Sequence, residues 1–190
     1  MLEELTKRYR EPHRKYHTLK HVLKMLDTAD VLGIAVPDHM AWAIWCHDVI
    51  YDLPANPMEN ETESAEWCAY YMEELGFDDK RVEAAKGMIL ATGWALKDNV
   101  PDMSEEQWSV VGLDLYGFGN RCCAEKAAVM LREEFSHLSN EQWSRGRIQF
   151  LNKLLDRPYI IYPTFFENED AYNTWHDNAR ENIERELEDL

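Results

Sequence analysis

The sequence has few cysteines, and their positions do not form a recognisable pattern. Only four occur in 190 residues, Cys46, Cys68, Cys122 and Cys123, and no two have Cys-x-x-Cys spacing. Neither a disulfide framework nor a cysteine-based zinc site is therefore indicated. A chain of this length can bury a sufficient hydrophobic core without such cross-links.

Long apolar runs and an apolar leader are also missing. No segment approaches the ~20 apolar residues that span a bilayer, and the first residues, MLEELTKRYREPH, are rich in charge. We therefore expect no membrane partner and a cytoplasmic location for this protein.

Basic residues are scarce, with 20 Lys and Arg against 36 Asp and Glu and a formal net charge of −16. This balance argues against a nucleic-acid backbone as the partner, because such a partner needs a basic face. Residues 1–24 are the exception, since they hold seven basic and three acidic side chains. This basic segment is either a solvated helix flank or a local site for a small anion.

Strand signals are lacking as well, whereas apolar residues make up 45% of the chain and often recur at helical spacing. Start and stop signals divide the chain into helices. We expect these over about 18–33, 38–52, 60–76, 78–93, 105–116, 120–135, 140–157 and 170–188. No linker marks a boundary, so we predict one all-α domain over 1–190, a compact helical bundle.

Five histidines and aspartates stand out against this background. His17 and His21 lie four residues apart, so they project from one face of a helix. His47 and Asp48 are adjacent in the apolar stretch AIWCHDVIYD, and Asp114 lies between two leucines. A carboxylate in an apolar helix is costly unless a cation or hydrogen bonds compensate. These residues are therefore candidates for a metal site.

The order of these residues resembles the HD superfamily of metal-dependent phosphohydrolases. Small members of that family have a YHxxxH opening, a WxHDxxYD core helix, an NExxS segment and a late DL. The matching segments here lie at 16–21, 45–52, 60–64 and 114–115, within a similarity that covers about residues 9–162. The resemblance implies the HD-domain type of helical fold.

By this resemblance, His21, His47, Asp48 and Asp114 would ligate one divalent ion. Two nitrogens and two carboxylates leave open positions, which favours Mn²⁺, Co²⁺, Ni²⁺ or Fe²⁺, with Mg²⁺ as a further option. His17 would face the open side of this metal site and contact substrate or a metal-bound water.

The implied reaction is attack of a metal-bound hydroxide on phosphorus in a small phosphorylated metabolite, with a nucleotide as the leading substrate class. Asp52 and Glu61 are candidates to orient water or protonate the leaving oxygen. Both residues are equally well explained as solvated side chains. Arg14 and Arg147 are candidate phosphate contacts, or surface ion-pair partners in this acidic protein.

Two positions depart from the family pattern. A histidine expected after Thr92 is absent, since the sequence reads Thr-Gly-Trp-Ala-Leu over 92–96, and Gly112 replaces an aspartate. These losses argue against a second metal and leave the substrate open. A diiron oxygenase of the HD fold and a non-catalytic metal- or nucleotide-binding module remain as alternatives, and a homo-oligomer is compatible with the sequence.

Overall fold

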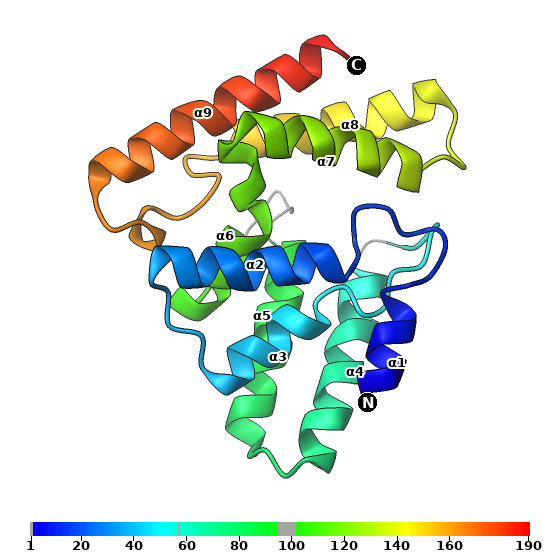
Figure 1. Cartoon of the computed structure of the whole chain (residues 1–190), viewed down its shortest axis with the longest axis vertical. Helices are drawn as coiled ribbons and strands as arrows, with labels where there is room; N and C mark the ends of the chain where they lie inside the picture. The colour runs from blue at the N-terminus through cyan, green and yellow to red at the C-terminus, as the bar shows by residue number, and fades with distance from the viewer. Residues whose placement is uncertain (1, 57, 95–101) are drawn as a thin grey trace.

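The computed structural model describes residues 2–56, 58–94 and 102–190, and all the regular structure in these ranges is helical (Figure 1). The α-helices are α1 Leu2–Arg8, α2 Leu19–Leu32, α3 Asp38–Cys46, α4 Glu59–Glu74, α5 Asp79–Trp94, α6 Glu105–Leu115, α7 Arg121–Glu134, α8 Asn140–Leu155 and α9 Glu169–Glu188. Two short 3₁₀ helices, η1 Tyr116–Gly119 and η2 Pro163–Phe165, follow α6 and precede α9. One hydrophobic core extends from Leu5 to Ile183, which confirms the prediction of a single all-α domain.

The helices form two groups with α2 and α6 between them (Figure 1). α7, α8 and α9 lie together at one end of the molecule, and α1, α3, α4 and α5 lie at the other. α4 and α5 form an antiparallel pair whose turn contains Gly76, with φ of 80°. Because α2 packs on both α3 and α6, the central helices bring distant parts of the sequence together.

Several helix ends lie where their capping residues predict them. Gly33 ends α2 in the left-handed conformation, with φ of 69°. Asp78, Ser104 and Asn120 each accept a hydrogen bond from a backbone N–H in the first turn of the helix that follows.

The predicted helix over 38–52 is wrong at its carboxyl end, because α3 ends at Cys46. The backbone beyond it bonds with other parts of the fold. The carbonyls of Asp48 and Val49 accept from Arg14, and Ser64 bonds both the N–H and the carbonyl of Ile50. These tertiary partners replace the helical hydrogen bonds that the apolar sequence favours.

The structure differs from the prediction at two further places, the chain start and α4. Residues 2–8 form α1, which was not predicted, with Glu3 and Glu4 in its first turn and Lys7 and Arg8 in its last. This charge order suits the helix dipole. Asn60 does not open α4, because its side chain bonds the backbone N–H and carbonyl of Asp52.

In the described ranges, no helix combines the length and the apolar character that crossing a membrane requires.

Candidate metal centre

Three predicted ligands, His21, His47 and Asp114, meet at one point in the fold. One ligand atom from each lies within 4.8 Å of the others. His21 projects from the first turns of α2, His47 follows the last residue of α3, and Asp114 lies near the end of α6. The central packing of α2 against α3 and α6 therefore assembles the group from three separate segments.

The Nε2 atoms of His21 and His47 are buried and lack hydrogen-bond partners. Nε2 of His21 lies 2.9 Å from Oδ1 of Asp114, and Nε2 of His47 lies 2.9 Å from Oδ2 of Asp48. Neither contact has the direction of a hydrogen bond, so both nitrogens remain unsatisfied. Buried polar atoms rarely lack partners. Two imidazole nitrogens that face carboxylate oxygens in this way fit a divalent cation.

A backbone contact fixes the orientation of His47. Its Nδ1 lies 2.9 Å from the carbonyl oxygen of Ile44, so the ring donates its Nδ1 proton there. The lone pair of a neutral ring is then on Nε2, which faces the group of ligands. Metal-bound histidines commonly have this second contact, which sets the tautomer and the ring plane.

Asp48, the fourth predicted ligand, contacts His47 but does not belong to the group of three. Burial favours the neutral acid, but the charges of His47 and His17 outweigh burial and hold the pKa of Asp48 well below its usual range. Burial alone would lower the pKa of His47, but the neighbouring Asp48 outweighs burial and raises this pKa to about 9. A cation and a proton would thus compete for this pair. Metal ligation by Asp48 stays a prediction.

His17 lies outside the ligand group, four residues before His21 in the chain. Its ring stacks on Tyr51 with centroids 4.2 Å apart and lies 6.0 Å from the ring of His21. The side chain is 17% exposed. Burial lowers the pKa of His17, but Asp48 and Glu134 outweigh this and raise it.

Glu134 is a site residue that the sequence prediction missed. Its side chain is fully buried and contacts Nδ1 of His17 from α7. Together with Ala124 and Leu131, it forms the buried face of that helix. A carboxylate on an apolar helix face was the signal that identified Asp48 and Asp114, and the same signal applied to α7 would have found Glu134.

Asp52 and Glu61, the two candidate acids, occupy different environments. Asp52 is exposed, and Asn60 bonds both of its backbone groups. Glu61 is partly buried, and burial together with the charges of Asp48 and Asp114 raises its pKa. Glu61 is therefore the better placed of the two to retain a proton beside the ligand group.

Arg14 does not have the surroundings of a phosphate contact. Its side chain has no exposed surface and bonds Glu11 together with the carbonyls of His17, Asp48 and Val49. All three guanidinium nitrogens are used in this way. This geometry favours a structural role, in which Arg14 ties the loop before α2 to the segment that carries Asp48.

Arg147 is also held by protein groups. It forms a bidentate ion pair with Glu186, in which Nε lies 2.7 Å and Nη2 3.2 Å from the two carboxylate oxygens. It also lines a small cavity of about 90 Å³ together with Tyr16 and Asp114. Phosphate binding by Arg147 stays a prediction, and its position beside Asp114 is compatible with it.

Of the two departures from the family pattern, Gly112 lies where a neighbouring side chain fills the space. A Cβ at Gly93 would overlap Sδ of Met58 and lie 3.0 Å from the Glu61 carboxyl group, and one at Gly112 would lie 2.7 Å from the Phe165 ring. An aspartate therefore has no room at position 112. The segment after Trp94, where the family histidine is expected, lies outside the described residues. In the ranges that the structure describes, His21, His47 and Asp114 form the one group suited to a metal.

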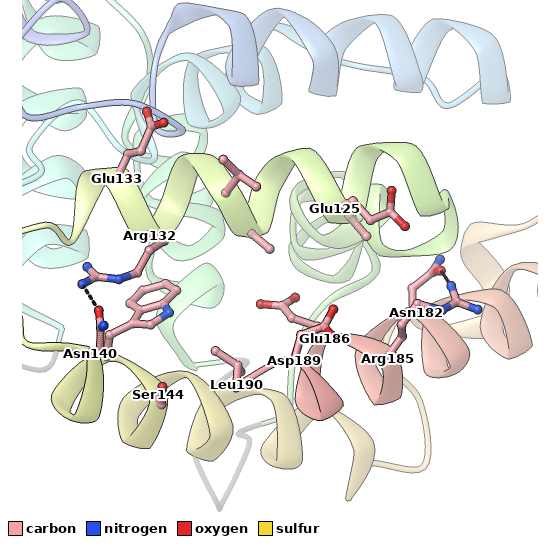
Figure 2. Close-up of a pocket in the computed structure, with 14 residues that line it drawn as sticks. Glu125, Arg132, Glu133, Asn140, Ser144, Asn182, Arg185, Glu186, Asp189 and Leu190 are labelled. Atoms are coloured by element: carbon pink, nitrogen blue, oxygen red, sulfur yellow. Dashed lines mark hydrogen bonds between the residues drawn. The ribbon is translucent and has the colours of Figure 1, made fainter.

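A larger cavity, of about 680 Å³, lies between α7, α8 and α9 (Figure 2). Arg132, Glu133, Asn182 and Glu186 are among its lining residues, and Arg132 bonds Asn140 across its edge. None of the predicted site residues lines it. The candidate metal centre is therefore separate from this cavity.

The chain matches no known protein family model, no curated protein and no solved structure.

Proposed function

We propose that this protein is a metal-dependent phosphohydrolase that acts on a small phosphorylated metabolite, with nucleotides as the first substrate class to test. The main support is the pair of buried Nε2 atoms, on His21 and His47, that face carboxylates without forming hydrogen bonds. The resemblance of the motif order to the HD superfamily supports the same proposal.

His21, His47 and Asp114 would hold the ion, with Asp48 as the fourth ligand. A divalent ion in this position would supply Lewis-acid chemistry, acidifying water and offsetting charge on a phosphoryl oxygen. Its charge would also oppose the effect of Asp48 and Asp114 on nearby pKa values.

The residues around this group have the properties that hydrolysis requires. Glu61, whose pKa is raised, is suited to protonate the leaving oxygen. His17 is partly exposed beside the ligands and can contact the phosphate or the attacking water. Tyr16, which lines the cavity beside Asp114, is suited to contact the organic part of the substrate.

The proposal is tested by loading the protein with Mn²⁺, Co²⁺ or Ni²⁺ and incubating it with a panel of phosphorylated metabolites. Phosphate, pyrophosphate and nucleoside are measured separately. We expect turnover of one substrate class that His21→Ala abolishes together with metal binding. His39→Ala is the control, because the His39 side chain contacts Glu106 and takes no part in the ligand group. Metal binding without turnover of any substrate would favour the non-catalytic binding module.

A further inference from the structure

Glu134 connects α7 to the loop that precedes α2. One carboxylate oxygen, Oε2, accepts hydrogen bonds from the backbone N–H groups of Lys15, Tyr16 and His17, at 2.7, 2.9 and 3.1 Å. Three consecutive N–H groups around one oxygen hold the loop in a single conformation, and a carboxylate accepts such bonds more strongly than a neutral group. The backbone of His17 is therefore fixed from outside its own segment.

The other oxygen, Oε1, contacts Nδ1 of His17. An ionised carboxylate can only accept, so Nδ1 must be the donor. In the neutral ring this leaves the lone pair on Nε2. Within the described residues Nε2 of His17 forms no hydrogen bond, and the side chain is 17% exposed next to the ligand group.

We infer that Glu134 is a positioning residue that holds His17 with Nε2 as the proton acceptor for the attacking water. The catalytic part of this inference rests on the proposed phosphohydrolase function. The tautomer of His17 does not depend on that function and can be measured separately.

The reaction that this arrangement supports is hydrolysis of the bond between phosphorus and the leaving oxygen. One O–H bond of water breaks, its proton moves to Nε2 of His17, and the water oxygen forms a bond to phosphorus. The bond between phosphorus and the leaving oxygen breaks, and that oxygen takes a proton from Glu61. Exchange with solvent then returns both residues to their starting states, so one water is consumed for each bond cleaved.

The first test measures the His17 ring by ¹⁵N NMR in the Zn²⁺-loaded wild-type protein, in which the metal is diamagnetic. The signal is assigned by its loss in His17→Gln. At a pH above the raised pKa of His17, we expect Nδ1 to have the shift of a protonated nitrogen and Nε2 that of an unprotonated one. Any other pattern would overturn the inference, whether or not the protein hydrolyses a substrate.

The second test compares Glu134→Gln with Glu133→Gln, which removes the same charge from the neighbouring, exposed residue. The glutamine carbonyl at 134 can still accept the three backbone bonds, but its amide group can only donate to His17. We therefore expect the proton of His17 to move to Nε2 in Glu134→Gln and to stay on Nδ1 in Glu133→Gln. An unchanged tautomer in Glu134→Gln would refute the positioning role.

In the activity arm, kcat of Glu134→Gln should fall on the order of 10²-fold, with KM and bound metal nearly unchanged. Glu133→Gln should keep wild-type kcat. A shifted tautomer with full activity would show that Glu134 orients His17 but that Nε2 does not act as the base. If no substrate is turned over even by the wild type, the proposed function fails while the NMR result still decides the role of Glu134 in orienting His17.

Discussion

Replacement of Arg14 by methionine should destabilise the whole domain, because the guanidinium group satisfies buried backbone. Its side chain donates to the carbonyls of His17, Asp48 and Val49, and to Glu11. The aliphatic part of methionine fills much of the same space, so the main loss is the hydrogen bonds. Leaving a buried acceptor without a partner costs about 1–3 kcal/mol. For three carbonyls, we expect unfolding to become easier by about 4 kcal/mol.

The assay is urea unfolding in the presence of EDTA, which separates this effect from any change in metal affinity. A loss of this size corresponds to a fall in Tm of about 10 °C for a domain of this length. Arg10→Met is the matched control, because Arg10 belongs to the same basic segment but is exposed. A surface substitution of this kind should change stability by less than about 0.5 kcal/mol.

The opposite result would restore the phosphate role of Arg14. If Arg14→Met unfolds at the same urea concentration as Arg10→Met, the buried hydrogen bonds contribute nothing measurable. A rise in KM for the phosphorylated substrate, at unchanged stability, would then identify Arg14 as a substrate contact.

Three other predictions concern the metal and the residues around it. Saturating the protein with Mn²⁺ or Ni²⁺ at 100 times Kd should raise Tm by about 8 °C relative to the EDTA-treated protein. Metal analysis should give one ion per chain, and equal Tm values with and without metal would refute the site. Gly93→Ala should lower kcat, because its Cβ would overlap Sδ of Met58 and lie 3.0 Å from the carboxyl of Glu61, so that both side chains must shift. Gly146→Ala, with open space around it, should leave kcat unchanged. Burial alone would raise the pKa of Glu134, but His17 and backbone N–H groups lower this pKa from 4.5 to about 2. The ionised Glu134 therefore stabilises the fold above pH ~4.5, and this stabilisation is lost as the pH falls toward 2. Acid titration should therefore destabilise Glu134→Gln less steeply over this pH range than Glu133→Gln, and parallel curves would contradict the linkage.

Much of the helical pattern could be predicted because its signals are local. Gly33, Ser104 and Asn120 act through backbone groups within one turn. The end of α3 could not be predicted, because the partners that stop it, Arg14 and Ser64, are distant in sequence.

The candidate site was predictable in part for a similar reason. Ionisable residues within apolar stretches of the sequence mark His47, Asp48 and Asp114 as candidates, and the family resemblance adds His21 to them. The surroundings of Arg14 depend on the path of the loop, so its basic neighbours in the sequence suggested an anion site where the fold has buried carbonyls. The function of the ligand group remains a proposal that metal analysis and substrate assays can test.

The bonds from Glu134 to the loop before α2 also make the amides of Lys15, Tyr16 and His17 reporters of a distant event. Their acceptor belongs to α7, which lies in the group of α7, α8 and α9 at one end of the molecule (Figure 1). If this group detaches as a unit, the three amides lose their acceptor together and exchange with solvent at the rate of that opening. Hydrogen exchange at residues 15–17 would then measure how firmly the carboxyl-terminal helices are attached to the rest of the domain.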